Sequence, residues 1–315
     1  MKRKIGIIGG AGFIGQNLTN FFVDCGYEVL VVSRKIDKTK LQHPNVFGAE
    51  VNVENTATLF ESLKQCETII WLVSSLVPSV SNDSLVDDFD SNISPLIRFL
   101  ELAKTSIFFK RFVYLSSGGT IYGDSLDNKP LDEDSSKKPI SSYGLSKIVT
   151  ENYIKFLTST SHFQSFILRP SNVYGQFQNL IKPQGIIGYA FKSIINNTSI
   201  DLYDDGRVTR DFIHVNDLAN AVHSCIESVF KKSQTAVYNV GSQKGYTIKE
   251  ILGKINATTQ MQIHTVPKSS RSFDCNYNVL KIEKIKRDMN WEPKIEIEDG
   301  LNLVWEWIKN EENEK

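Results

Sequence analysis

Tyr143 and Lys147 form the pair of side chains in this sequence that is best suited to move a proton. They lie four residues apart in the segment Ser142-Tyr-Gly-Leu-Ser-Lys147, and in a helix this spacing places both on one face. A phenol with a pKa of about 10 is a weak acid or base at neutral pH. A fixed ammonium nearby lowers that pKa because it favours the phenolate. The pair therefore indicates acid–base chemistry, although the same spacing also arises by chance on many helices.

A glycine turn near the N-terminus predicts a cofactor site. Gly9, Gly12 and Gly15 follow a short apolar strand at 4–8 and open a segment with helical spacing at 13–25. The first glycine permits a tight turn, the second lets the backbone approach a pyrophosphate, and the third lets helix and strand pack closely. The helix N-terminus also favours negative charge. We expect a dinucleotide here, with a purely structural turn as the alternative.

The residues after the second apolar strand, at 28–32, bear on the choice of cofactor. Ser33, Arg34 and Lys35 stand where an NAD-selective site usually carries an acid for the ribose 2′-hydroxyl. A hydroxyl and two cations suit a 2′-phosphate instead. The sequence therefore favours NADP(H), with NAD as the possible alternative and a solvated basic loop as the interpretation without a ligand.

A turn of small residues follows a further strand at 111–115. The run Tyr114-Leu-Ser-Ser-Gly-Gly-Thr-Ile-Tyr-Gly123 would lie at the edge where doubly wound sheets bind ligands. Ser116, Ser117 and Thr120 offer hydroxyls that could bond a substrate oxygen. An ordinary loop rich in turn-forming residues is the alternative.

Together these motifs resemble the extended short-chain dehydrogenase/reductase family, which contains nucleotide-sugar epimerases, dehydratases and 4-ketoreductases. The resemblance covers nearly the whole chain. It rests on Gly-Gly-Ala-Gly-Phe-Ile-Gly15, Ser-Ser-Gly-Gly-Thr-Ile-Tyr-Gly123, Tyr143-x-x-x-Lys147, Arg169-Pro-Ser-Asn-Val-Tyr-Gly175 and Gly206-Arg-Val-Thr-Arg-Asp-Phe-Ile-His-Val-Asn-Asp217.

The resemblance implies a role for each residue that matches these motifs. Tyr143 would be the acid/base, and Lys147 would tune it and hold the nicotinamide ribose. The other cofactor-binding residues would be Gly9, Gly12, Phe13, Ile14, Gly15, Ser33, Arg34, Asn52, Val53 and Ser74. The nucleotide sugar would meet Asn92 on the nicotinamide side, Asn172 at the diphosphate, and Arg210 and Arg271 at phosphates or the nucleoside ribose.

One position departs from the family pattern at the centre of the site. The family's catalytic Ser or Thr lies four residues before the Tyr of the Tyr-Gly pair, and here that residue is Gly118. Ser117 or Thr120 must then supply the hydroxyl. The dehydratase branch carries an Asp-Glu pair in this turn, whereas Gly119 and Thr120 bear no carboxylate, which argues against 4,6-dehydration.

Two redox reactions fit these motifs. The preferred one is the stereospecific reduction of a dTDP- or UDP-linked 4-keto-6-deoxyhexose by NADPH, for surface polysaccharide synthesis. The basic cofactor edge favours it because an enzyme that exchanges its cofactor draws on the NADPH pool. The alternative is an NAD-dependent UDP-hexose 4-epimerase of the UDP-glucose or UDP-N-acetylglucosamine type. A second alternative is a non-catalytic protein that senses NADP(H).

The elements that position these residues alternate between strand and helix. A strand–helix–strand unit within about 30 residues implies a parallel sheet. Further helices are expected at 56–65, 95–104, 142–157, 187–196, 216–230 and 301–308, and further strands at 68–73, 165–168 and 236–240. We predict an α/β fold, a Rossmann-type doubly wound parallel sheet with a smaller, interleaved C-terminal substrate lobe.

The dinucleotide-binding domain would span 1–168, with 212–242 returning to it. The nucleotide-sugar lobe would span 169–211 and 243–315.

Composition narrows the remaining possibilities. The 36 basic and 36 acidic residues cancel, so bulk charge points to neither nucleic acid nor membrane. Four scattered cysteines form no CxxC pair, which predicts reduced thiols and no metal site. The acidic residues Asp87, Asp88 and Asp90 are expected in a solvated loop. The apolar runs are too short for a membrane span, so a cytoplasmic enzyme is expected. By resemblance it would form a homodimer through helices near 92–104 and 142–157.

Overall fold

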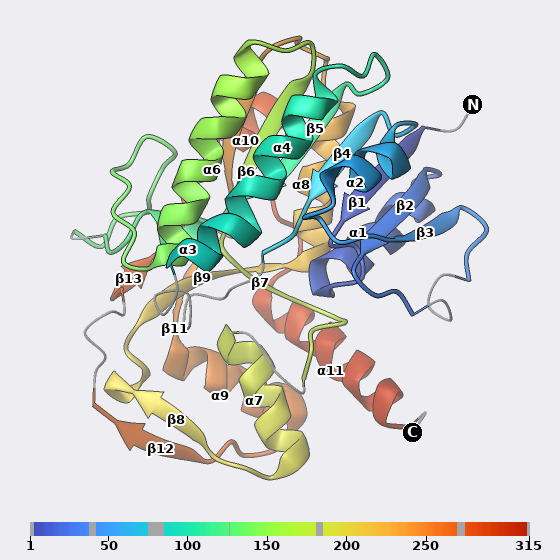
Figure 1. The fold of residues 1–315 in the computed structure, drawn as a ribbon. Helices are drawn as coiled ribbons and strands as arrows, with labels where there is room; N and C mark the ends of the chain where they lie inside the picture. The colour runs from blue at the N-terminus through green and yellow to red at the C-terminus, as the bar shows by residue number, and fades with distance from the viewer. Residues whose placement is uncertain are drawn as a thin grey trace.

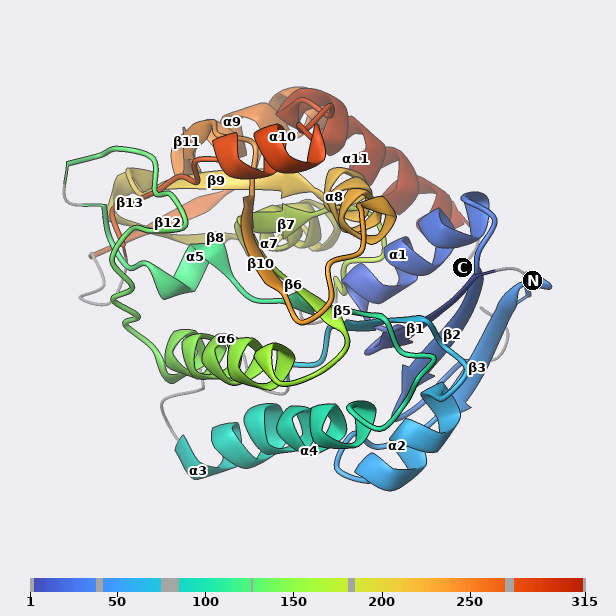
Figure 2. The same ribbon diagram turned by 90° about the horizontal axis from the view of Figure 1, so that it is seen from above.

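A sheet of seven parallel strands is the centre of the computed structural model (Figures 1 and 2). The structure describes residues 3–37, 42–74, 85–125, 127–180, 185–269 and 275–313. The strand order is β10-β6-β5-β4-β1-β2-β3. The order reverses between β1 and β4, and this reversal is where doubly wound sheets bind ligands. The strands are β1 (Lys4–Ile8), β2 (Glu28–Ser33), β3 (Val46–Glu50), β4 (Thr68–Trp71), β5 (Arg111–Leu115), β6 (Gln164–Pro170) and β10 (Thr235–Val240).

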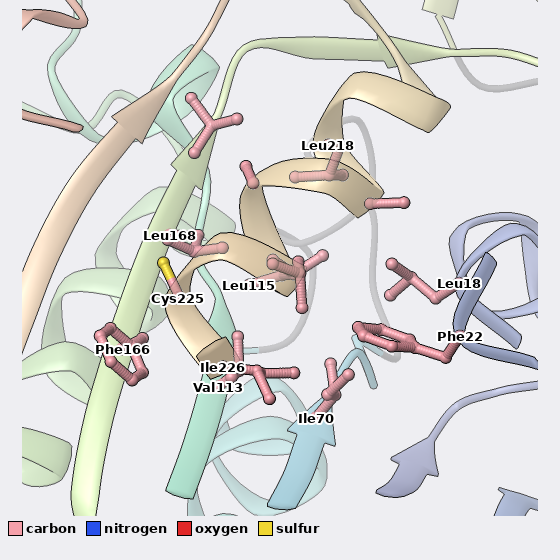
Figure 3. Close-up of a cluster of buried hydrophobic side chains, with 14 of the residues drawn as sticks. Leu18, Phe22, Ile70, Val113, Leu115, Phe166, Leu168, Leu218, Cys225 and Ile226 are labelled. Carbon is pink, nitrogen blue, oxygen red and sulfur yellow. The ribbon is translucent and has the colours of Figure 1, made fainter. Parts of the chain in front are cut away.

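Helices cover both faces of this sheet. One face carries α1 (Phe13–Asp24), α8 (Val215–Glu227) and α10 (Glu283–Met289), and the other carries α2 (Thr56–Leu63), α4 (Ser94–Ala103) and α6 (Ser142–Ser159) (Figure 2). Leu18 and Phe22 of α1 lie four residues apart, so both face the strands, and both are fully buried. Figure 3 shows them in one apolar cluster with Leu218 of α8 and Phe166 of β6. Each such side chain contributes about 1.5–3 kcal/mol on burial.

A smaller lobe lies below the carboxyl ends of the large sheet's strands in Figure 1. Its strands are β7 (Asn172–Tyr174), β9 (Thr209–His214), β11 (Gly245–Thr247) and β13 (Tyr277–Asn278) in one sheet, and β8 (Ile200–Tyr203) and β12 (Thr265–Lys268) in another. Its long helices are α7 (Gly185–Asn196), α9 (Ile248–Thr259) and α11 (Ile297–Asn313). A separate apolar core joins the three helices to β7, β8, β9 and β11, so the lobe has its own packing.

The predicted fold class is confirmed, and the predicted elements agree closely with the observed ones. The strand at 4–8 matches β1, and the helix expected at 142–157 is α6. The sequence patterns did not indicate β3 or the short strands of the smaller lobe. Within 212–242, α8 packs on α1 and β10 pairs with β6, whereas β9 pairs in the smaller lobe. The division into two domains stays a proposal.

Candidate active site

Lys147 is held against the carboxyl end of β5. Its ammonium donates to the carbonyl oxygen of Leu115 at 3.0 Å. It also lies 4.8 Å from the ring centroid of Tyr114 and 5.3 Å from that of Tyr143. The side chain is 6% exposed. The predicted helical spacing therefore does bring Tyr143 and Lys147 together. Tyr143 lies in the first turn of α6 (Ser142–Ser159), and Lys147 follows it one turn later.

The two serines that follow Leu115 are also bonded to α6. Ser116 Oγ donates to Glu151 Oε1 at 2.6 Å. The Ser117 hydroxyl hydrogen-bonds to the Tyr143 phenol, and the Ser74 hydroxyl, which follows β4, does so too. Three consecutive residues at the end of β5 are thus fixed to three residues of α6. This register positions the phenol at the carboxyl ends of β4 and β5, beside the reversal point of the sheet.

Burial dominates the proton affinities of the pair. It raises the pKa of Tyr143 to about 12, although hydrogen bonds from the two serine hydroxyls oppose this rise. It lowers the pKa of Lys147 to about 8, against the opposing charges of Glu151 and Asp88. Asp88 also raises the pKa of Tyr143. Lys147 therefore gives up its proton more readily than a free lysine. The predicted lowering of the Tyr143 pKa by this ammonium is wrong for this structure, because burial is the largest influence on the phenol and raises its pKa.

Gly118 cannot be replaced by the hydroxyl residue of the family pattern without movement of the chain. A Cβ at this position would lie 2.9 Å from the carbonyl oxygen of Arg169 and 2.5 Å from Leu280 Cδ1. Real Cβ atoms do not approach backbone so closely. Ser117 is the hydroxyl in contact with the phenol. The buried Oγ1 of Thr120 has no hydrogen-bond partner among the described residues.

The glycine turn has the geometry expected of a dinucleotide site. Gly9 has φ 84°, a left-handed conformation that side chains disfavour, and its amide donates to the Val32 carbonyl at 2.8 Å. Gly12 is the N-cap of α1 without any capping side chain. A Cβ on Gly15 would lie 2.5 Å from Gly10 Cα. The N-terminus of α1 therefore lies directly at the turn, and no side chain caps it.

The edge of the sheet beyond the turn carries charges of both signs. Ser33 ends β2, and the side chains of Arg34 and Lys35 after it are exposed. Glu50, at the end of the neighbouring β3, accepts a hydrogen bond from the Ile36 amide at 3.0 Å. The sequence pattern did not reveal this carboxylate, because it comes from a strand that was not predicted. The edge is thus less basic than the sequence suggested.

A cavity of about 1350 Å³ runs from the glycine turn to the smaller lobe. Gly10, Ala11, Lys35 and Asp37 line one side of it, and residues of α7 and α11 line the other. The remaining residues assigned to the cofactor by resemblance lie along the same sheet edge: Phe13 and Ile14 in the first turn of α1, Asn52 and Val53 after β3, and Ser74 after β4.

The substrate-side residues lie in two places. Asn172 and Arg210 both line a pocket of about 330 Å³ in the smaller lobe. The Asn172 side chain donates to the Asp211 carbonyl at 2.9 Å, and Arg210 Nη1 donates to the Thr209 carbonyl at 3.0 Å. Asn92 instead lies in η2 (Phe89–Ile93), a π-helical turn that packs on α6. Arg271 lies outside the described residues.

The acidic cluster was predicted to be a solvated loop, and this is wrong for Asp88. Asp88 ends the short helix α3 (Leu85–Asp88) and is fully buried, while Asp87 and Asp90 are exposed. A fully buried carboxylate requires hydrogen-bonding partners, and α6 supplies two of them. In the part of the chain that the structure describes, no cluster of His, Cys, Asp and Glu could hold a metal ion.

A buried ion pair beneath the site also escaped the sequence analysis. Arg169 donates to both carboxylate oxygens of Glu151, at 2.9 and 2.6 Å, and each residue is 1% exposed. Arg169 also donates to the Tyr122 hydroxyl at 2.8 Å, which in turn donates to Asn239. Glu151 follows Lys147 by four residues, so both lie on the same face of α6. This spacing was the signal in the sequence that could have placed Glu151 near the site.

We expect Arg169→Met to destabilise the protein by about 3–5 kcal/mol, because it leaves the Glu151 carboxylate buried without its cation. Urea unfolding measures this change. The matched control is Lys64→Met, which breaks the exposed Lys64–Glu61 pair and should change stability by no more than about 0.5 kcal/mol. Equal effects of the two substitutions would contradict a structural role for the buried pair.

The fold and the site define a doubly wound α/β protein with a dinucleotide-type glycine turn at the point where strand order reverses. Residues 5–241 match the NAD dependent epimerase/dehydratase family, and the chain belongs to this family. It is thus a member of a family of nucleotide-sugar epimerases, dehydratases and reductases. No helix among the described residues is long and apolar enough to cross a membrane.

Similar proteins carry out more than one reaction. A putative UDP-glucose 4-epimerase of Methanocaldococcus jannaschii is 29% identical over 307 residues, which cover 96% of this chain and 98% of that one. A dTDP-4-dehydro-6-deoxyglucose reductase of Escherichia coli is 28% identical over 319 residues, 98% of each chain. The structure of a UDP-glucose 4-epimerase from Thermotoga maritima, solved with UDP-glucose, superposes with a TM-score of 0.90 at 27% identity, over 98% of this chain and 99% of that one.

Proposed function

We propose that this protein reduces the 4-keto group of a dTDP- or UDP-linked 6-deoxyhexose with NADPH, in the cytoplasm, for the synthesis of surface polysaccharide. The observation that carries the proposal is the phenol of Tyr143, which is half-buried and hydrogen-bonded to Ser117 beside the Lys147 ammonium. Such a group can deliver a proton to a carbonyl oxygen. The 28% identical reductase supports the choice of reaction.

The residues present fit a nicotinamide dinucleotide. Gly9 and Gly15 let the turn pack tightly, because a Cβ on Gly9 would lie 3.3 Å from the Val73 amide and one on Gly15 would lie 2.5 Å from Gly10 Cα. The N-terminus of α1 at this turn favours the charge of a pyrophosphate. When bound, the reduced nicotinamide supplies hydride to the carbonyl carbon. Lys147 is placed to hold the nicotinamide ribose once its ammonium leaves the Leu115 carbonyl.

Tyr143 completes the reduction by giving its proton to the carbonyl oxygen. The ammonium of Lys147 stabilises the phenolate that remains, and Ser117 hydrogen-bonds to the same oxygen. Solvent returns the proton to the phenolate before the next turnover. Asn172 and Arg210, in the pocket of the smaller lobe, would hold the diphosphate and nucleoside of the substrate, and Arg271 is proposed to join them.

We expect tighter binding of NADPH than of NADH, because Ser33, Arg34 and Lys35 offer one hydroxyl and two cations to a 2′-phosphate. Glu50 is bonded to the Ile36 amide, so that carboxylate is already engaged. Titration of each reduced cofactor by its fluorescence measures the two dissociation constants. Binding of NADH that is equal to or tighter than that of NADPH would contradict the preference and favour a resident NAD.

We expect Ser117→Ala to lower kcat more than Thr120→Val does. Ser117 contacts the phenol, whereas the Thr120 hydroxyl has no protein partner in the described part of the chain. Loss of a hydrogen bond to a charged oxygen costs about 1.5–3 kcal/mol, or roughly 10- to 100-fold in rate. Steady-state kinetics of the two variants compare them. If neither substitution lowers kcat, no hydroxyl in this turn assists Tyr143.

A UDP-hexose 4-epimerase is the second candidate, and the similarity to UDP-glucose 4-epimerases favours it. In that reaction Tyr143 would act first as base and then as acid, and the cofactor would stay bound. Purified protein is mixed in one arm with NADPH and a 4-keto nucleotide sugar, and in the other with UDP-glucose and no added cofactor. Consumption of NADPH in the first arm supports reduction. UDP-hexose interconversion in the second arm alone would overturn it.

A non-catalytic sensor of NADP(H) is disfavoured because both Tyr143 and Lys147 are present and in contact.

We also propose a homodimer formed by α4 and α6. These two helices pack against each other and expose Leu102, Tyr153 and Phe156, which are 37%, 41% and 65% exposed. Sedimentation equilibrium should give twice the chain mass.

A further inference from the structure

Asp88 joins the catalytic helix to the π-helical turn that carries Asn92. Its Oδ2 accepts a hydrogen bond from Ser142 Oγ at 2.8 Å and a second, shorter one from Ser146 Oγ. Its Oδ1 accepts from Asn92 Nδ2 at 2.7 Å. Ser142 and Ser146 are the residues directly before Tyr143 and Lys147. One fully buried carboxylate therefore fixes the helical turn that carries both reactive side chains.

The surroundings of Asp88 differ from those of the other carboxylate near Lys147. Glu151 is neutralised by the two hydrogen bonds from Arg169. Asp88 receives its three side-chain hydrogen bonds from neutral groups, and among the described residues no Lys, Arg or His forms a salt bridge with it. Asp88 nevertheless influences the reactive pair electrostatically, because its charge raises the pKa of both Lys147 and Tyr143.

The backbone around Asp88 also connects this residue to the catalytic helix. Asp88 stands at the junction between α3 and the π-helical turn η2, and both pack against α6 (Figure 1). A single π-helical turn is rare and occurs often at functional sites. Here it directs the Asn92 amide to Asp88. The turn thereby holds Asn92 in fixed relation to α6.

We propose that Asp88 is a positioning residue for the reaction, which fixes Tyr143, Lys147 and Asn92 relative to one another through Ser142 and Ser146. This inference rests on the proposed function. The same carboxylate also helps to keep Lys147 protonated. The groups that face the Lys147 ammonium are Glu151 and Tyr143 from α6, Tyr114 from β5 and Asp88 from α3.

The test compares Asp88→Asn with Asp90→Asn. Both substitutions remove one negative charge from the same segment, but Asp90 is exposed. The inference predicts that Asp88→Asn lowers kcat about 10- to 100-fold, as expected for small misplacement of reacting groups, with little change in KM. The alkaline limb of its pH profile should move to lower pH, because Lys147 loses its proton more readily. Asp90→Asn should match the wild type in both respects.

An unchanged kcat and pH profile in Asp88→Asn would overturn the inference. If Asp88→Asn does not fold, the Ser142→Ala, Ser146→Ala double variant decides, because it keeps the charge but removes two of the bonds. A lowered kcat supports the inference, and wild-type kcat overturns it. NMR titration of 13C-labelled Lys147 needs no sugar substrate. Absence of turnover in the wild type would contradict the proposed function alone, whereas an unshifted Lys147 titration in Asp88→Asn would contradict the role of Asp88.

Discussion

Replacing Tyr143 by Phe is expected to lower kcat by about 10²- to 10⁴-fold, the range in which a positioned acid or base contributes to rate. The substitution removes only one hydroxyl from a half-buried ring, so the fold should persist. KM and cofactor affinity should change little, because the phenol acts in the transition state more than in binding. Steady-state kinetics and fluorescence titration of the reduced cofactor measure these quantities.

The matched control is Tyr153→Phe, which makes the same chemical change on the same helix. Tyr153 is 41% exposed and lies ten residues beyond Tyr143. The kcat of the Tyr153→Phe variant should therefore equal that of the wild type. A Tyr143→Phe variant with normal turnover would contradict the assignment of the acid. If Tyr143→Phe also kept full function in cells, the sensor alternative would be favoured.

Replacing Lys147 by Met is expected to lower kcat/KM by a comparable factor, at least about 10²-fold. The ammonium is lost, and with it both the hydrogen bond to Leu115 and the stabilisation of the Tyr143 phenolate. Cofactor affinity should also fall, which distinguishes this variant from Tyr143→Phe. Kinetics and cofactor titration together separate the two roles of the lysine.

The pH dependence of kcat/KM gives a second readout of Lys147. Its pKa is about 8 in the folded protein because burial disfavours the ammonium. Below that value the ammonium is present, so wild-type activity should be full there and fall as pH rises through about 8. The Met variant has no group to titrate and should lack this limb. Lys155→Met, also on α6, should keep it. A limb that persists in Lys147→Met would show that another group titrates.

The sequence predicted the parts of the fold that depend on local pattern. Helical spacing placed Tyr143 and Lys147 on one face of α6, and the glycine turn was found between β1 and α1. Strong apolar runs identified β1 and β5. β3 escaped because its five residues, Val46–Glu50, are mostly exposed at the edge of the sheet and carry no clear apolar run.

What the sequence could not reveal depends on contacts between distant segments. The bond from Ser146 to Asp88 joins residues 58 positions apart, and no local pattern encodes it. The constraint on Gly118 comes from Leu280 and the Arg169 carbonyl, both far along the chain. Glu50 reached the cofactor edge through the register of β3 with β2. Asp88 was predicted to lie in a solvated loop, but it is buried and accepts hydrogen bonds from α6.

The transfer of labelled hydride from cofactor to sugar tests the central claim most directly. NADPH that carries deuterium at nicotinamide C4 is mixed with the protein and a dTDP- or UDP-linked 4-keto-6-deoxyhexose, and the product is analysed by NMR. When the deuterium is on the face of the nicotinamide ring from which hydride is transferred, we predict one deuterium at sugar C4 for each NADPH oxidised. We also predict that the Tyr143→Phe variant does not make this transfer. Unlabelled sugar and unconsumed NADPH, together with interconversion of UDP-hexoses without added cofactor, would contradict the proposed reduction.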